Sequence, residues 1–198
     1  MGTVQSFPGS QVQTDRIEAC KQFLELAIPE VNWASEHVQR TPERFLSMLR
    51  ELTSPDEDHF ELTTFPNDMN VDEMVIVQDI PFHSLCAHHI VPFYGHAHIA
   101  YIPEERIAGL SKFARTVKYM SKGLWTQEEL STSISEFLQE HLQPKGVAVV
   151  IQAEHLCMTI RGVQSPGTIT TTSSMKGVFL DPARSARHEF LALIQPRH

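Results

Sequence analysis

Apolar residues near the start of the chain recur every three or four positions, the spacing of a helix with one buried face. The first such stretch runs from Asp15 to Ile28 before Pro29, with apolar positions at Ile17, Cys20, Phe23, Leu24 and Ala27. The second follows Thr41, an N-cap residue with Pro42 after it, and has apolar positions at Phe45, Met48, Leu49 and Leu52. The pattern predicts two helices.

The next hundred residues change to the patterns typical of strands. β-Branched residues are concentrated over Met74–Ile80, His96–Ile102 and Val147–Glu154, and the last of these alternates strictly between two sets of side chains. A Thr/Ser-rich stretch over Thr168–Ser174 also favours extended structure. We expect these strands to form an antiparallel sheet.

Two further helices are predicted between the second and third strands. One has Leu110, Phe113, Val117 and Met120 on its apolar face and ends near Gly123. The other begins with a T-x-x-E capping box formed by Thr126 and Glu129. The order of elements predicts an α+β fold with helices on one face of an antiparallel sheet.

Composition and charge limit the organisation and the partners. A chain of 198 residues with 41% hydrophobic residues predicts a single domain, over residues 15–198, behind a short flexible arm at 1–14. The net charge of -8 argues against a nucleic-acid partner. Because no signal peptide and no apolar run of about 18 residues is present, we expect a cytoplasmic protein without a membrane partner.

The segment Cys86-Ala87-His88-His89 places a thiol and an imidazole three positions apart, and Cys157 lies far along the chain. Two cysteines and one histidine supply three ligands, which is the number that catalytic zinc uses while it keeps a position for water. A four-ligand structural site that includes His88 is an alternative. So is the reading in which these cysteines and histidines are ordinary buried residues.

His88 and His155 each adjoin or lie near a proposed ligand. A histidine beside an activated water can move protons near neutral pH, as ring hydrolysis requires. Each of them can equally be a structural histidine.

Other residues have the chemistry for an anionic substrate. Ser111, Lys112 and Arg115 lie at a predicted helix start, where phosphate binds well, and Arg161 can add a third cation. Glu128 lies in the first turn of a helix and can accept hydrogen bonds from guanine. The alternatives are a solvated basic helix face and a carboxylate stabilised by the helix dipole.

Taken together, the motifs resemble those of GTP cyclohydrolase I in order and spacing. The resemblance extends from about Arg40 to Ile194, and the matching segments are SLCAHHIVPFYGHAHIAYIP, GLSKFART, TQEEL, EHLCMTIRGV, TTTSSMKGVFL and RHEFL.

The resemblance implies roles for individual residues. Cys86, His89 and Cys157 match the zinc ligands, and His88 and His155 match the histidines that handle protons. The remaining matches are substrate contacts: Glu128 and the neighbouring Gln127 for guanine, Ser111 for ribose, and Lys112, Arg115, Arg161 and Arg44 for the triphosphate.

The resemblance also implies the reaction and the assembly. Zinc activates a water for attack on C8 of GTP, His155 protonates N7 as the ring opens, and formate leaves before rearrangement to 7,8-dihydroneopterin triphosphate. The fold implied is the tunnelling fold, in which the sheets of several subunits join into a barrel. The assembly implied is a homodecamer of two pentamers with active sites at subunit junctions.

One departure from the family pattern is Ala87, which occupies the usual place of a glutamate. A carboxylate that orients a histidine or tunes the metal is therefore missing at that position. Two alternatives to GTP hydrolysis stay open at this point: a related enzyme of a specialised purine or deazapurine pathway, and a zinc-stabilised assembly protein without catalysis.

Overall fold

The computed structural model describes residues 8–55, 62–183 and 185–195. The chain divides into two compact units, over residues 1–52 and 53–198. In the first unit, helix α1 (Pro8–Ala27) contributes buried Cys20 and Leu24, and helix α2 (Thr41–Thr53) follows. Helix α1 begins at Pro8, earlier than the predicted start at Asp15. The sequence pattern misses this part of the helix because it lacks apolar residues at helical spacing. The predicted arm at 1–14, of which 1–7 lie outside the described residues, and the predicted domain at 15–198 remain predictions.

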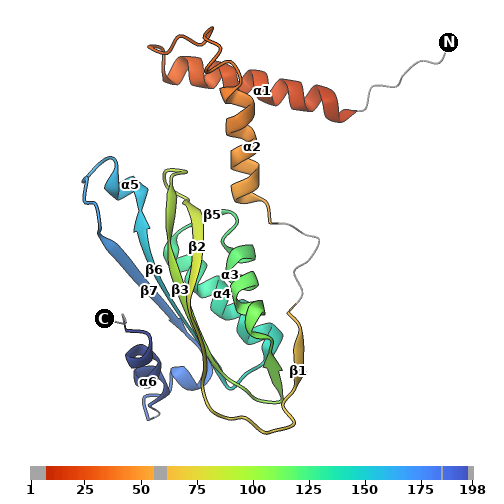
Figure 1. The fold of residues 1–198 in the computed structure, drawn as a ribbon, viewed down its shortest axis with the longest axis vertical. Helices are drawn as coiled ribbons and strands as arrows, with labels where there is room; N and C mark the ends of the chain where they lie inside the picture. Colours follow the sequence, from red (N-terminus) through yellow and green to blue (C-terminus); the bar gives the residue numbers. More distant parts are fainter. Residues whose placement is uncertain (1–7, 56–61, 184, 196–198) are drawn as a thin grey trace, which may run out of the picture. The chain divides into compact units, whose positions relative to one another are not determined.

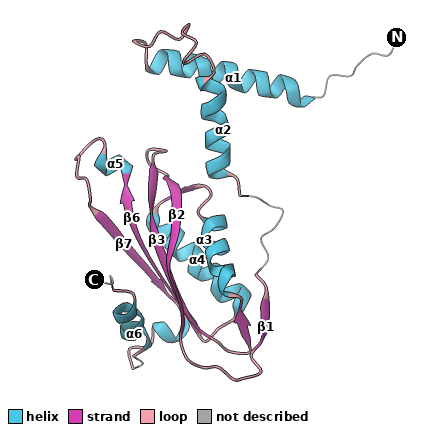
Figure 2. Ribbon diagram, viewed as in Figure 1, coloured by secondary structure: helices cyan, strands magenta, loops and turns pink. Residues whose placement is uncertain are grey.

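The second unit is built on a five-stranded sheet with the strand order β5-β2-β3-β6-β7. Its strands are β2 (Val75–Cys86), β3 (Pro92–Ile102), β5 (Leu124–Trp125), β6 (Gly146–His155) and β7 (Ile169–Met175). All neighbours are antiparallel except β5, which runs parallel to the end of β2. Figure 2 shows β2, β3, β6 and β7 side by side.

Helices α3 (Leu110–Met120) and α4 (Gln127–Leu142) cover one face of this sheet (Figure 1). They pack Phe113, Val117, Leu130 and Ile134 against strand residues such as Ile151, all fully buried. The predicted α+β class, with an antiparallel sheet and helices packed on it, is confirmed.

Among the described residues, the helices that cover the opposite face of the sheet lie at one end of it. There the 3-10 helix η2 (Gly177–Phe179) and helix α6 (Ala186–Leu193) pack Phe179 and Phe190 against Ala100, Ala148 and Val150. The prediction placed helices on one face only. The additional helix follows β7 and covers the small side chains of the other face.

A β-bulge between Val77 and Ile80 keeps β2 in register with the core. Asp79 adopts a left-handed conformation with a φ of 58° within it. The extra residue lets Val77, Ile80 and Phe82 all contribute to the core beneath the helices.

The remaining elements are short. Strands β1 (Thr64–Pro66) and β4 (Arg106–Ala108) form a two-stranded ladder, and helix α5 (Leu156–Thr159) directly follows β6. Among the described residues, no helix is long and apolar enough to cross a membrane.

Candidate metal centre

The topology of the sheet brings the two ligand-bearing segments together. Strands β2 and β6 both run antiparallel to β3, which lies between them. Both therefore finish at the same end of the sheet. Cys86 is the last residue of β2, and Cys157 lies in α5, two residues after the end of β6. A separation of more than seventy residues in the chain thus becomes proximity in space.

A tight turn after β2 directs His89 back toward Cys86. The backbone N–H of Cys86 donates to Val91 O at 2.9 Å, and the N–H of Ile90 donates to Cys86 O at 2.8 Å. Ile90 takes the left-handed conformation with a φ of 54°, which reverses the chain. The turn therefore holds the histidine pair beside the thiol.

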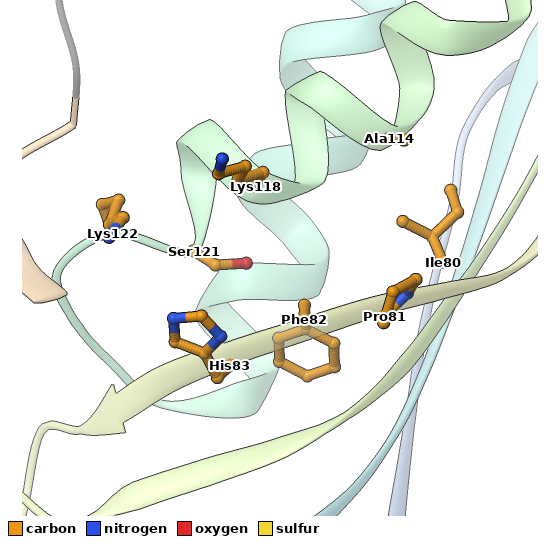
Figure 3. Close-up of a pocket in the computed structure, with 8 residues that line it drawn as sticks. All are labelled: Ile80, Pro81, Phe82, His83, Ala114, Lys118, Ser121 and Lys122. Carbon is orange, nitrogen blue, oxygen red and sulfur yellow. The ribbon is translucent and has the colours of Figure 1, made fainter.

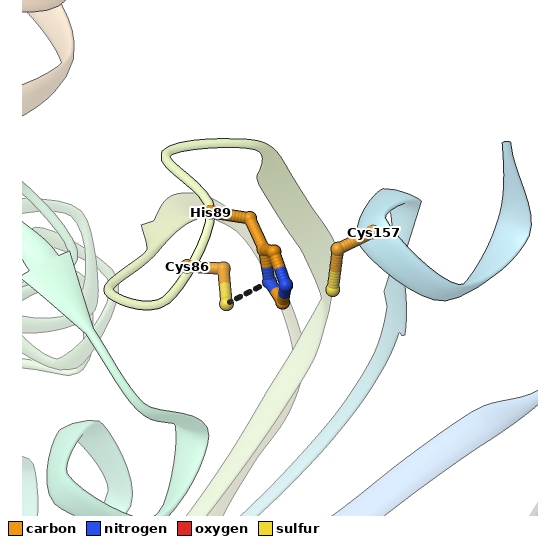
Figure 4. Close-up of side chains that lie close together, drawn as sticks. All are labelled: Cys86, His89 and Cys157. Atoms are coloured by element: carbon orange, nitrogen blue, oxygen red, sulfur yellow. Dashed lines mark hydrogen bonds between the residues drawn. The ribbon is translucent and has the colours of Figure 1, made fainter. Parts of the chain in front are cut away.

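The ligand atoms of Cys86, His89 and Cys157 all lie within 4.8 Å of one another (Figure 4). His89 Nδ1 is 3.9 Å from Cys86 Sγ, and His88 Nδ1 is 3.8 Å from the same sulfur. Cys86 is buried, whereas both histidines are exposed. The arrangement is a Cys-His-Cys group that could hold a metal ion.

The surroundings of Cys157 favour its neutral thiol in the absence of an ion. Burial raises the pKa of Cys157, and the neighbouring Cys86 raises it further, while the positive charge of Arg161 acts in the opposite direction. A metal that binds here must therefore displace a proton, so that its affinity rises with pH. This influence on the pKa of Cys157 indicates that the charge of Arg161 lies near the group.

His155, at the end of β6, lies on the same side of the sheet as the buried Phe93. The two rings stack with centroids 4.7 Å apart and an interplanar angle of 3°. Burial lowers the pKa of His155, and the nearby negative charge of Glu128 partly offsets the decrease. The stacking role of Phe93 had no sequence signal, because Phe93 resembles any other core phenylalanine of a strand.

Gln127, predicted as a guanine contact, is 2% exposed, and its polar atoms are bonded within the protein. Its amide nitrogen donates to Ile151 O, Thr170 O and Thr172 Oγ1, at 3.0, 3.0 and 3.1 Å. Its oxygen lies 2.8 Å from His155 Nε2. The guanine role of Gln127 stays a prediction, and the observed partners are strands β6 and β7 and the histidine.

Glu128 lies next to Gln127 but on the exposed side of α4. It lines a cavity of about 390 Å³ together with Trp125, Glu129, Thr132 and Ser133. Trp125 pairs with Cys86 in the sheet, so this cavity adjoins the metal group. A carboxylate is thereby available for a ligand beside the candidate metal centre.

The start of α3 lies at the opposite end of the sheet. Phe113, beside Lys112, packs its ring 5.2 Å from that of Tyr101 near the end of β3, whereas Phe93 near the start of β3 contacts His155. Phe93 and Tyr101 are eight residue steps apart along the extended strand, or roughly 27 Å. Ser111, Lys112 and Arg115 are therefore not brought to the metal group within one chain. Arg44 lies on α2 in the other compact unit.

A separate cavity of about 380 Å³ lies between β2 and α3 (Figure 3). Its lining includes Lys118 and Lys122 from the end of α3, and the other lining residues are Ile80, Pro81, Phe82, His83, Ala114 and Ser121. Over Ile80–His83 no strand of the described chain pairs with this side of β2. The cavity thus follows an open edge of the sheet.

Comparison with known proteins identifies the family. The family model described as GTP cyclohydrolase I matches residues 17–195. The chain belongs to the GTP cyclohydrolase I family.

Several relatives extend this finding along most of the chain. The GTP cyclohydrolase 1 of Hydrogenobaculum sp. is 47% identical over 179 residues, covering 90% of this chain and 96% of the relative. That of Aquifex aeolicus is 48% identical over 160 residues, covering 81% of this chain and 85% of the relative. That of Sulfurihydrogenibium sp. is 45% identical over 184 residues, covering 92% and 96%.

Among solved structures, an archaeosine synthase QueF-Like in the apo form is 17% identical, with a TM-score of 0.42. The similarity covers 52% of this chain and 93% of that chain. A similarity of this extent carries no argument about function.

Glu154 does not replace the carboxylate that is missing at Ala87. Its side chain accepts hydrogen bonds from Gly167 N–H at 3.1 Å, Thr159 Oγ1 at 3.0 Å and Tyr94 OH at 3.1 Å, and these bonds lower its pKa. As the neighbour of His155 along β6, it faces the other side of the sheet. Ala87 itself is exposed and donates its N–H to Trp125 O at 3.0 Å.

Proposed function

We propose that this chain converts GTP into 7,8-dihydroneopterin triphosphate and formate at a zinc site formed by Cys86, His89 and Cys157. The observation that carries the proposal is that these three ligand atoms lie close together at one end of the sheet, near His155 and Glu128. Family membership supports the same reaction, because the relatives are named GTP cyclohydrolase 1.

The ligand set fits zinc better than the hard cations. Two thiols and an imidazole are soft or borderline ligands, which zinc prefers, whereas magnesium and calcium take oxygen. Tetrahedral coordination at about 2.3 Å to sulfur separates two sulfur ligands by roughly 3.8 Å. The observed spacing, within 4.8 Å, needs only small side-chain adjustments to reach that geometry.

A zinc ion held by Cys86, His89 and Cys157 would supply an activated water for attack on C8 of the purine. His155, whose pKa is lowered by burial, can accept a proton from the attacking water and return it to N7 as the imidazole ring opens. His88, whose Nδ1 is 3.8 Å from Cys86 Sγ, is the second proton carrier for release of formate. The two histidines thus serve successive hydrolyses.

Guanine recognition falls to Glu128 in the adjoining cavity. Its two carboxylate oxygens can accept one hydrogen bond each from guanine N1–H and the exocyclic amine. The cavity of about 390 Å³ is open enough for a ligand to reach this carboxylate. The assignment favours guanine over adenine, which presents an acceptor at N1.

Phosphate binding requires a second copy of the chain in this proposal. The start of α3, with Ser111, Lys112 and Arg115, lies roughly 27 Å along β3 from the metal group, farther than one nucleotide can bridge. Arg161 lies near Cys157 and can bind phosphate from the metal side. We assign the remaining phosphate and ribose contacts, including Arg44, to residues that converge at subunit junctions.

The sheet has edges that suit such an assembly. Strand β7 ends the sheet on one side, and β2 has an open edge over Ile80–His83 on the other. Open edges tend to pair with another strand, and pairing β2 of one copy with β7 of the next extends the sheet toward a closed barrel. The decamer of two pentamers is the assembly proposed for this chain.

The proposal is tested by incubating the zinc-loaded protein with GTP and measuring zinc content, formate and pterin fluorescence together. We expect Cys157→Ala to lose both zinc and products, while Cys20→Ala, a buried cysteine in the first compact unit, keeps both. Full activity in a metal-free preparation would contradict the zinc mechanism.

A further inference from the structure

The side chain of Gln127 has only one consistent orientation. Its amide nitrogen faces Ile151 O, Thr170 O and Thr172 Oγ1 at 3.0–3.1 Å. Two of these partners are carbonyl oxygens, which accept hydrogen bonds and never donate them. Exchanging the amide's nitrogen and oxygen would set three oxygens against one another inside a buried site, so the oxygen of Gln127 must face His155.

That orientation determines which nitrogen of His155 carries hydrogen. The oxygen of a carboxamide only accepts, and it lies 2.8 Å from His155 Nε2. Nε2 must therefore be the N–H of the ring. A neutral imidazole has a single N–H, so Nδ1 is left with a lone pair.

The plane of the His155 ring is held as well. Phe93 stacks on it nearly parallel, at 3° and 4.7 Å, and is fully buried, so rotation of the imidazole would break both the stacking and the bond to Gln127. Gln127 is itself held by β6 and β7 through three hydrogen bonds. The orientation of the ring is thus tied to the sheet.

We propose that Gln127 is a positioning residue that holds His155 with its ring hydrogen on Nε2, leaving Nδ1 as the ring nitrogen that is free to act on the purine. The second half of this statement rests on the proposed function, whereas the first half is a property of the protein without substrate. Gln127 then acts on the reaction through the histidine, and it leaves the direct contact with guanine to Glu128.

Two variants separate this role from simple bracing of the strands. Both Gln127→Glu and Gln127→Leu lose the donors to Ile151 O and Thr170 O. Only Gln127→Glu keeps an oxygen that can accept from His155 Nε2. A purely structural role predicts equal damage in the two variants, whereas a positioning role predicts that Gln127→Glu retains the tautomer.

The measurement is solid-state NMR of the zinc-loaded assembly with nitrogen-labelled histidine, in which His155→Asn identifies the signals of His155. We expect a protonated Nε2 in the wild-type protein and in Gln127→Glu, and a bare Nε2 population in Gln127→Leu alone. Turnover of GTP by Gln127→Leu should fall roughly 10- to 100-fold at nearly constant KM, with a smaller fall for Gln127→Glu.

A bare Nε2 in the wild-type protein would overturn the inference even if neither variant folded. Equal loss of turnover in two folded variants, or a raised KM at constant kcat, would overturn it in favour of bracing or of guanine contact. Failure of the proposed function has a different signature, namely a wild-type protein that releases no formate from GTP while its His155 carries hydrogen on Nε2.

Discussion

Glu128 lies in the first turn of α4, where the positive end of the helix stabilises a carboxylate whatever its function. Replacing it with glutamine keeps the size of the side chain but presents an amide donor to the donors of guanine. We expect Glu128→Gln to lower kcat/KM for GTP by the equivalent of about 1–3 kcal/mol, the cost of a polar group left unsatisfied once bound guanine covers it.

Folding should hardly change in this variant, because Glu128 is exposed. The matched control is Glu140→Gln, an exposed glutamate of the same helix that does not line the cavity, which should leave turnover unchanged. Equal kinetics for Glu128→Gln and the wild-type protein, measured at steady state, would return Glu128 to the role of a helix-end carboxylate.

Ala87 is the second residue whose chemistry can be tested by itself. The carboxylate of Glu154 does not reach the site, because it accepts hydrogen bonds from Gly167, Thr159 and Tyr94. We expect slow turnover in the wild-type protein, and we expect Ala87→Glu to raise kcat at nearly constant KM, because the substrate contacts are unchanged.

Single-turnover kinetics with formate and pterin followed separately can locate the step that changes. Ala87→Gln has the same size without the charge and should not raise kcat. If Ala87→Glu left turnover unchanged or lowered it, the alanine would be an adapted feature of this enzyme.

At the scale of elements, α4 connects the fold to the site through its N-terminus. Thr126 accepts from Glu129 N–H at 3.2 Å, and the Glu129 carboxylate accepts from Thr126 N–H at 3.3 Å. Removing the hydroxyl in Thr126→Ala should cost about 1 kcal/mol of folding free energy. Because Gln127 and Glu128 directly follow the cap, kcat should fall as well.

Thermal unfolding and steady-state kinetics check this prediction together. For a chain of this size the loss corresponds to a decrease in Tm of roughly 2–4 °C. Thr126→Ser keeps the hydroxyl and should behave like the wild-type protein. An unchanged Tm in Thr126→Ala would mean that the packing of α4 alone fixes the start of the helix.

The elements that the sequence predicts best are those with a local signal. The capping box of α4 is present as predicted, and β7 matches the Thr/Ser-rich stretch. Strand β2 extends to Cys86, beyond the predicted end at Ile80. The prediction ends too early because Pro81 and a bulge interrupt the sequence pattern. Pro81 is tolerated at this open edge, where no strand needs its missing N–H. Such pairing is nonlocal, and the sequence carries no direct sign of it.

The site shows the same division between local and nonlocal information. Residue types and family resemblance predict the three metal-ligand candidates. The arrangement of β2 and β6, which finish at the same end of the sheet, brings them together. The bond from Gln127 to His155 was not predicted, because it depends on how α4 packs over the sheet. Adjacent residues on a helix, Gln127 and Glu128, point to opposite environments.

At the scale of the whole molecule, separation of the metal group from α3 predicts that active sites are shared between copies. Cys157→Ala and Lys112→Ala should each be nearly inactive alone. Every junction needs a metal group from one copy and an intact start of α3 from the other, and each variant lacks one of these two halves. Co-expressed, they should recover roughly a quarter of wild-type activity, since that share of junctions receives two intact halves at random mixing.

The measurement is GTP turnover of the purified mixed assembly, with separately expressed and unmixed variants as the control. Recovery demonstrates that the two halves come from different copies. Activity in the mixed assembly no greater than the sum of the separate variants would place both halves within one chain.

The central claim is that the chain removes C8 of GTP at the Cys86, His89 and Cys157 group. The most direct measurement uses GTP isotopically labelled at C8 and follows the label by NMR. We predict that the label appears in formate in an amount equal to the dihydroneopterin triphosphate formed, and that Cys157→Ala shows neither product. Label that remains in an intact purine, or in the pterin, after incubation with zinc-loaded protein would contradict the account.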